Sequence, residues 1–183
     1  MIDLHALSSF IKIRNVVDGE IARLIGRPAH SGHIGEYVAA KVFDIDLNAS
    51  ASHRAIDGHF RSGPLAGRSA NIKYGSRRDG TLDLVASLDL ANHPNYYLVL
   101  TGPSGAAISS KGFSAPWVIQ QVFLFEAAGL LGNFAVKGTK PGVATSVRSA
   151  LWAEAMIYPQ AVNPGLVIND EQREALQRFR DID

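Results

Sequence analysis

Residues 55–61 read Ala-Ile-Asp-Gly-His-Phe-Arg, and residues 69–74 read Ser-Ala-Asn-Ile-Lys-Tyr. Both segments have the alternation of half-buried strands, and the residues between them are rich in Gly and Pro, as in a turn. Asp57 lies on one face of the first segment, and Asn71 and Lys73 share a face of the second. If the segments pair as a hairpin, these faces coincide. The stretch therefore predicts a carboxylate, an amide and an ammonium group close together on one face of the sheet.

Two helices are expected before this hairpin. Residues 4–25 have apolar side chains at roughly helical spacing, and the Gly-Arg-Pro sequence at residues 26–28 ends that pattern. Gly32 to Phe43 is apolar on two sides, which is typical of a buried helix. Glu36 lies within this second helix, and a buried carboxylate needs a cation, a metal ion or a network of donors. Two roles are open for Glu36: a salt bridge to one of the six basic residues between 53 and 78, and a metal or acid-base role.

The rest of the chain continues the mixture of strands and helices. Strands are expected at 96–100 and 117–125, a short helix at 127–131, and longer helices at 143–157 and 170–180. This order indicates an α/β or α+β domain with one mixed sheet. We expect a single domain over residues 1–183, with a core at about 31–125 and the N-terminal and C-terminal helices packed on it.

Positive charge is concentrated on the hairpin. The chain has 18 Lys and Arg against 17 Asp and Glu, a net charge of +1. Residues 53–78 nevertheless carry six basic side chains and one acid, a local excess of five. Such clusters bind phosphate backbones by releasing counterions, although a solvated surface strand explains them as well. The basic residues are Arg54, Arg61, Arg68, Lys73, Arg77 and Arg78.

A second candidate anion site follows Lys137. The Gly-rich residues 137–142 run into the helix expected at 143–157, and a helix N-terminus attracts phosphate. Lys140 and Arg148 add positive charge there, and an ordinary helix cap is the alternative.

The order of these residues resembles the PD-(D/E)xK nuclease superfamily, which has the restriction-endonuclease-like fold. The residues that carry the resemblance are Glu36 in the first core helix, Asp57 in a strand, and Asn71-Ile72-Lys73 in the next strand. It covers about residues 31–100 and looks most like an uncharacterised bacterial branch. The resemblance implies an α/β fold, a restriction-endonuclease-like core whose central mixed β-sheet is flanked by helices.

The resemblance also implies Mg²⁺-dependent hydrolysis of phosphodiester bonds, with Mn²⁺ as a substitute. By this carry-over Asp57 is the main metal ligand, Glu36 supports the metal or the water, and Lys73 is the catalytic lysine. The Ile72 carbonyl is a further oxygen ligand. Asn71 departs from the pattern, because an acid is expected there; it keeps an oxygen but loses a charge, which Glu36 would have to supply.

Nucleic acid is the expected partner, with DNA as the substrate and with His59, Arg61, Arg77, Arg78, Lys140 and Arg148 as contacts. A homodimer is left open, since cleavage of two strands by this kind of fold often needs two sites. The alternatives are an inactive nucleic-acid-binding relative and an interaction domain with a buried ion-pair network.

The composition places the chain among ordinary globular proteins. It is 46% hydrophobic and 19% charged, and it has no apolar run long enough to cross a membrane. Cysteine is absent, which excludes disulfides and Cys-based zinc sites. With no signal-peptide pattern at the N-terminus, we expect a cytoplasmic protein without membrane contact.

Overall fold

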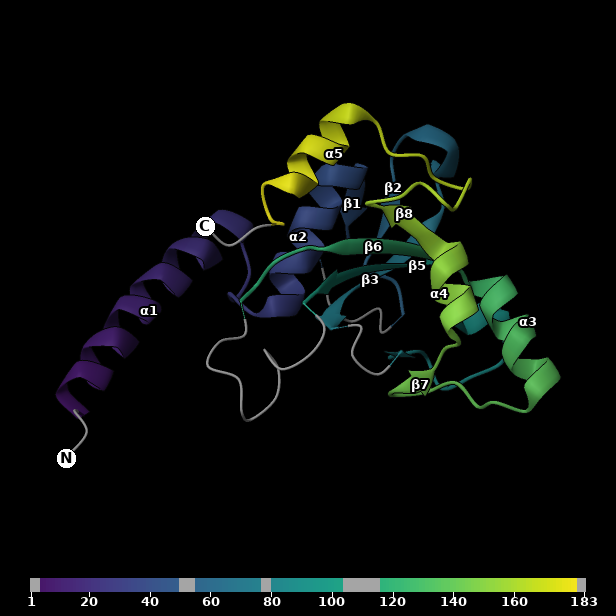
Figure 1. Ribbon diagram of the computed structural model, residues 1–183, viewed down its shortest axis with the longest axis horizontal. Coiled ribbons are helices and arrows are strands. Elements are labelled where there is room, and N and C mark those ends of the chain that lie inside the picture. The colour runs from purple at the N-terminus through teal and green to yellow at the C-terminus, as the bar shows by residue number, and fades with distance from the viewer. Residues whose placement is uncertain (1–3, 50–54, 77–79, 104–115, 181–183) are drawn as a thin grey trace.

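A computed structural model of the chain describes residues 4–49, 55–76, 80–103 and 116–180 (Figure 1). The helices are α1 (Leu4–Ile25), α2 (Ser31–Phe43), α3 (Ala127–Lys137), α4 (Ser149–Ala155) and α5 (Asp170–Gln177). The strands are β1 (Ile45–Leu47), β2 (Gly58–Phe60), β3 (Ser69–Ser76), β4 (Thr81–Leu82), β5 (Tyr96–Gly102), β6 (Gln121–Glu126), β7 (Thr145–Ser146) and β8 (Met156–Tyr158). Two short 3-10 helices, η1 (Gly63–Leu65) and η2 (Leu90–Asn92), complete the elements.

Six of the strands form one mixed sheet in the order β1-β2-β3-β5-β6-β8. Only β3 and β5 run parallel; the other neighbouring strands are antiparallel. β4 and β7 pair in a separate two-stranded sheet. The α/β class with a mixed central sheet is therefore confirmed, and so is the antiparallel pairing of the two strands that were expected to form a hairpin.

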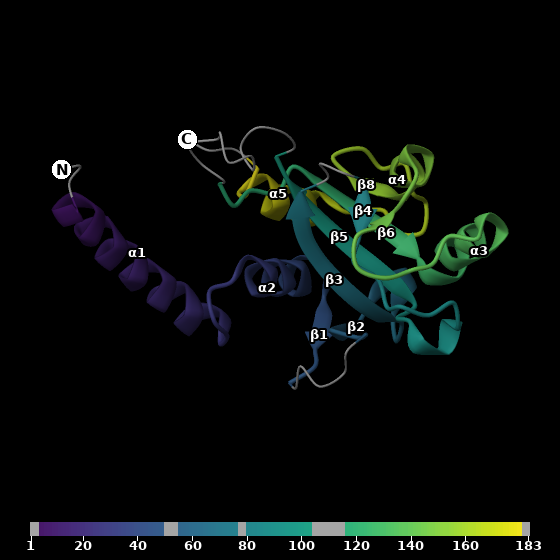
Figure 2. The ribbon, with the colours of Figure 1, turned by 90° about the horizontal axis from the view of Figure 1, so that it is seen from below.

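Helices cover both faces of the sheet, and each face has its own apolar core (Figure 2). On one face α2 packs on β3 over Ala70 and Ile72, and α5 contacts α2 and adds Leu176 to the same core. On the other face α3 and α4 pack around Phe123 and Phe125 of β6. Because side chains alternate along a strand, neighbouring residues of β3 face different cores. This alternation decides which residues of β3 can meet each helix.

One edge of β3 is left open beyond its first residues. β2 is only three residues long and pairs with β3 at Gly58–Ala70 and His59–Ser69, whereas β3 continues to Ser76. No described strand pairs with this edge of β3 after Ala70. The backbone groups of Ile72 on that edge therefore have to find partners other than a strand.

A glycine brings α2 against β3. A Cβ atom built on Gly35 lies 2.7 Å from the Cβ of Tyr74, which is closer than real side-chain atoms approach. The helix ends at Asp44, which adopts a left-handed conformation with φ of 53°. Arg61 and Ser62 hold the Asp44 carboxylate and so tie the end of α2 to the chain after β2.

Several boundaries differ from the sequence expectations. The helix expected at 143–157 is limited to α4 (Ser149–Ala155), with β7 before it and β8 after it. Thr145 and Ile157 are buried as strand residues, so tertiary pairing overrides the helical spacing of the apolar side chains. Asp57 lies just before β2, not within a strand, and α3 continues six residues beyond Leu131 to Lys137.

The first helix lies differently from the expectation that it packs on the core. α1 has the predicted bounds, Leu4–Ile25, and ends at Gly26 with φ of 70°. It extends away from the rest of the molecule in both views, and none of its residues is buried (Figures 1 and 2). Most of its large apolar side chains are therefore exposed to water.

The close approach at Gly35 yields a stability prediction. Gly35→Ala forces α2 away from Tyr74, so we expect the free energy of unfolding to fall by about 1–2 kcal/mol despite the better helix propensity of Ala. The matched control is Gly32→Ala in the same helix, where an added Cβ meets nothing within 4 Å and stability should be unchanged or slightly raised. Urea unfolding of the three proteins measures both effects. Equal stabilities would contradict the packing of α2 on β3.

Candidate functional site

The candidate site is built on the open edge of β3. Asp57 Oδ2 accepts a hydrogen bond from the Ile72 backbone N–H at 2.6 Å. The N–H and C=O of one strand residue point to the same edge, so the Ile72 carbonyl also faces this side. Asp57 is itself placed by its backbone, whose N–H donates to Ala70 O at 2.9 Å and whose carbonyl accepts from Asn48 N–H at 2.8 Å. A carboxylate and a backbone carbonyl thus lie along one short stretch of strand edge.

Glu36 reaches this region from α2. Its Oε2 lies 2.5 Å from Arg27 Nη1, and only 17% of its side chain is exposed. Arg27 also donates from Nη2 to Asn48 O at 2.8 Å, so it links the start of α2 to the end of β1. Glu36 therefore forms a salt bridge, which is one of the two roles that the sequence leaves open. The partner is Arg27, which is not one of the six basic residues between 53 and 78.

Nearby charges shift the pKa values of both carboxylates: Asp57 and Lys73 act on Glu36, and Lys73 acts on Asp57. Burial raises the pKa of Asp57, while the Ile72 N–H and the charges of Lys73 and Arg27 lower it. Burial also raises the pKa of Glu36, the charge of Asp57 raises it further, and Arg27, His33 and Lys73 lower it. Both pKa values end above the ordinary ones. The fold therefore holds two carboxylates where burial disfavours their charged forms.

Asn71 and Lys73 lie on the face of β3 opposite to α2. They are opposite Tyr97 and Val99 of β5, which belong to the core under α3 and α4. Asn71 is 4% exposed, and its Oδ1 has no hydrogen-bond partner among the described residues. Lys73 lines a hollow of about 190 Å³ with Thr81, Asp83 and others, and it forms no salt bridge with a described residue. Glu36 and Asn71 therefore lie on opposite faces of the sheet.

The donor set suits a hard divalent cation. Carboxylate, amide and backbone carbonyl oxygens are the ligands that Mg²⁺ prefers, and one or two carboxylates are enough to hold it. Asp57, Glu36 and the Ile72 carbonyl supply such oxygens, and the buried Asn71 Oδ1 is an oxygen without a partner. Among the described residues no group of three or more His, Cys, Asp or Glu is arranged to hold a metal. A metal here would thus depend on the backbone and the amide as well as on the two acids.

The residues expected to contact substrate are dispersed. Arg61 follows β2 at the end opposite to Asp57, about 13 Å along the strand, and its side chain is bound to Asp44. His59 is exposed, as are Lys140 and Arg148. The helix expected at 143–157 begins only at Ser149, so Lys140 lies nine residues before its start and Arg148 directly precedes it. Arg77 and Arg78 lie outside the described residues.

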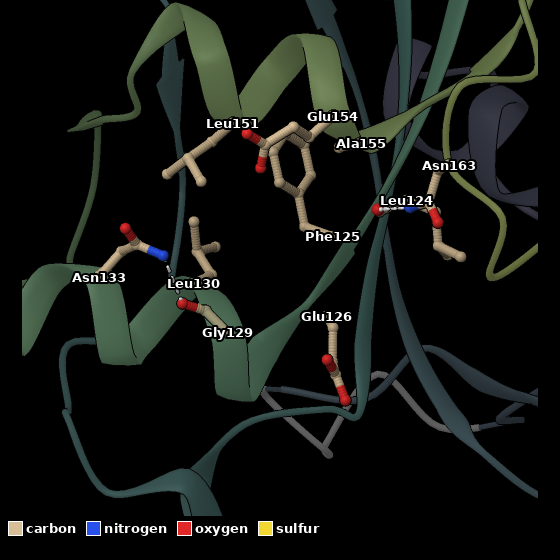
Figure 3. Close-up of a pocket in the computed structure, with 10 residues that line it drawn as sticks. All are labelled: Leu124, Phe125, Glu126, Gly129, Leu130, Asn133, Leu151, Glu154, Ala155 and Asn163. Atoms are coloured by element: carbon tan, nitrogen blue, oxygen red, sulfur yellow. Dashed lines mark hydrogen bonds between the residues drawn. The ribbon is translucent and has the colours of Figure 1, made fainter.

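A separate pocket of about 190 Å³ lies between α3, α4 and the end of β6, and none of the predicted site residues lines it (Figure 3). The two amide side chains that line this pocket both donate hydrogen bonds to backbone carbonyls. Asn133 donates to Gly129 O at 2.9 Å, and Asn163 donates to Leu124 O at 2.8 Å. The carboxylates of Glu126 and Glu154 lie apart from each other in Figure 3. The open edge of β3 therefore remains the better candidate site.

In comparisons with known proteins, no family model and no curated protein matches this chain. The length and composition of the described helices do not allow any of them to cross a membrane.

The role of Arg27 yields a pH-dependent prediction. Arg27→Met leaves Glu36 half-buried beside Asp57 without its cation and leaves Asn48 O without its donor. We expect a loss of about 1–2 kcal/mol in the free energy of unfolding at neutral pH. Because Arg27 lowers the pKa of Glu36, its removal raises that pKa further. The loss is therefore full above the raised pKa and shrinks as the pH falls through it.

The control for this measurement is Arg23→Met. Arg23 also pairs with a glutamate, Glu20, at 2.5 Å, but its side chain is 77% exposed, so its loss should change stability by less than about 0.5 kcal/mol at any pH. Chemical unfolding between about pH 4 and pH 8 compares the two variants. A loss for Arg27→Met that does not depend on pH would contradict the electrostatic account.

Proposed function

We propose that this chain is a metal-dependent nuclease of the PD-(D/E)xK, restriction-endonuclease-like type, which hydrolyses phosphodiester bonds of nucleic acid, with DNA as the expected substrate. The observation that carries the proposal is the position of Asp57. Its carboxylate is held on the open edge of β3 at the Ile72 N–H, within electrostatic reach of Glu36 and Lys73. Acid, acid and lysine come from three separate elements, which is a common arrangement of catalytic groups.

The charge state of these residues supports the proposal. Carboxylates held at raised pKa values destabilise a fold at neutral pH, and such groups cluster at functional sites. A divalent cation between them would compensate the like charges of Asp57 and Glu36. Lys73, which pairs with no described carboxylate, has its charge available for a phosphate.

The residues would divide the work as follows. Asp57, the Ile72 carbonyl and the Asn71 amide oxygen would bind Mg²⁺, and Glu36 would bind it or accept a proton from the attacking water. When bound, Mg²⁺ neutralises charge on the phosphate and favours an ionised water molecule. Lys73 would orient the attacking water and stabilise the extra negative charge that the phosphate gains in the transition state. Because Asn71 carries no charge, Glu36 would have to serve as the second acid of the site. Arg27 holds the Glu36 carboxylate through one amino group and so restrains its position.

One observation favours a second candidate function. Arg27 joins Glu36 and the Asn48 carbonyl, and Asp57 caps a backbone N–H, so all three side chains already have structural partners. An interaction domain that uses this network only for stability would show the same contacts. An inactive nucleic-acid-binding relative would also keep them. The three candidates differ in their dependence on Mg²⁺ and on the individual charges.

A cleavage assay separates them. With Mg²⁺ and supercoiled plasmid DNA, we expect the wild-type protein to nick or linearise the DNA, and we expect Asp57→Asn and Lys73→Met each to lose about 100-fold or more of the rate. Both changes keep the shape of the side chain, so the fold should persist. A chelator should abolish the wild-type activity.

The matched controls are Asp46→Asn on the exposed face of β1 and Lys137→Met at the end of α3, which should keep the wild-type rate. DNA binding without cleavage, unaffected by a chelator, would support the inactive relative. Neither binding nor cleavage, together with loss of stability in Asp57→Asn, would support the structural network. Cleavage that survives Asp57→Asn would contradict the proposed site.

A further inference from the structure

The first helix has an apolar surface that no described part of the chain covers. α1 has no buried residue, and eight of its large apolar side chains are about half exposed or more. Phe10 is 68% exposed and Leu24 is 70% exposed. The helix extends from the rest of the molecule in both views (Figures 1 and 2). A contiguous apolar surface of this kind usually marks an interaction site.

The spacing of these side chains indicates what kind of partner fits. Six positions along one side of α1 follow each other at intervals of three and four residues, which is the seam of two packed helices. Five of the six side chains are apolar, and the remaining one, Arg14, is a cation. The six positions are Leu7, Phe10, Arg14, Val17, Ile21 and Leu24.

Arg14 of this stripe and Asp18 beside it favour a second copy of the same helix. Arg14 Nε lies 3.4 Å from Asp18 Oδ2, and this pair sits near the middle of the apolar side. In a parallel pair of identical helices, each charge would face the same charge of the other copy. In an antiparallel pair, Arg14 of one copy lies beside Asp18 of the other, and each charge finds its opposite. The pattern is self-complementary only in the antiparallel arrangement.

We propose that α1 binds α1 of a second copy of this chain as an antiparallel helix pair. Placing Leu7 opposite Leu24 also places Phe10 opposite Ile21 and Arg14 opposite Val17, because each pair of residue numbers adds up to 31. Residues 6–25 of the two copies then overlap over about 30 Å. A single helix pair of this length buries less than the about 800 Å² per partner of a standard interface. The dimer should therefore form at micromolar concentrations and dissociate on dilution.

This inference does not rest on the proposed nuclease activity. It uses only α1, whereas the candidate site uses α2, β3 and the residue before β2. A protein without nuclease activity could still dimerise through α1, and an active nuclease could remain a monomer.

Analytical ultracentrifugation of the full chain over a range of concentrations tests the proposal. We expect a monomer–dimer equilibrium for the wild-type protein and a dissociation constant at least about 100-fold larger for Phe10→Glu, which loses an apolar contact in both copies. Phe10 is exposed in the single chain, so the variant should fold, which circular dichroism can check. The control is Val136→Glu on α3, an equally drastic change at an 87% exposed site, which should keep the wild-type equilibrium.

Cross-linking tests the direction of the helices. The natural chain has no cysteine, so each introduced thiol is unique. A mixture of the Leu7→Cys and Leu24→Cys proteins should cross-link between the two variants, and each variant alone should cross-link at least about tenfold less, because identical positions are far apart in an antiparallel pair.

Three results would overturn the proposal. The first is a wild-type protein that stays monomeric at all concentrations up to about 100 μM, where an interface of this size should be populated. The second is a dimer that Phe10→Glu leaves unchanged. The third is a monomer that binds vesicles of anionic lipid through α1, since the same apolar side would then serve a membrane surface.

Discussion

The hydrogen bond from the Ile72 N–H to the Asp57 carboxylate is the interaction on which the site depends. It exists because β2 begins only at Gly58, opposite Ala70, while β3 continues to Ser76, so that the backbone of Ile72 has no strand partner on that edge among the described residues. A backbone donor at a strand edge attracts a carboxylate, and the residue before β2 is the one in reach. The same short strand that leaves the edge open thus fixes the acid beside it.

Once Asp57 is fixed, the surrounding elements supply the other charges. Gly35 lets α2 approach β3 closely, and the next residue of that helix is Glu36. Lys73 follows Ile72 on the same strand but faces the opposite core. The site therefore spans the edge of the sheet, with Glu36 on one face, Asn71 and Lys73 on the other, and the Asp57 carboxylate at the edge. Arg27 is the only described residue that forms a salt bridge with either carboxylate.

This arrangement is unfavourable for stability taken alone. Burial raises the pKa values of both Glu36 and Asp57, and the like charges raise that of Glu36 further. Structural acids are normally placed where a hydrogen bond or a cation lowers their pKa, as Ser62 and Arg61 do for Asp44. Sites that bind a cation are a common exception, since the ion supplies the missing charge when it binds.

Local patterns in the sequence predicted much of this structure, and the rest depends on tertiary contacts. The helical spacing of residues 4–25, the bounds of α2 and the pairing of β2 with β3 follow from periodicity and turn residues. The helix expected at 143–157 is shorter than predicted because the residues on both sides of α4 form strands: β7 pairs with β4, and β8 pairs with β6. Arg27 was missed because its partner Glu36 lies nine residues away across a break between helices, which periodicity does not relate. The order of the candidate acids along the chain is visible in the sequence. The burial of the Asn71 side-chain oxygen without a hydrogen-bond partner among the described residues is a tertiary feature that the sequence does not show.

The most direct test of the account is the melting temperature of the wild-type protein and of Asp57→Asn at neutral pH, each with and without millimolar Mg²⁺. The amide still accepts the Ile72 hydrogen bond but removes a carboxylate whose pKa is raised, so without Mg²⁺ the variant should melt at the same temperature as the wild type or higher. Addition of Mg²⁺ should raise the melting temperature of the wild type and leave that of the variant unchanged. A variant that melts lower than the wild type without Mg²⁺, with neither protein responding to the ion, would contradict the claim that Asp57 is held for a cation.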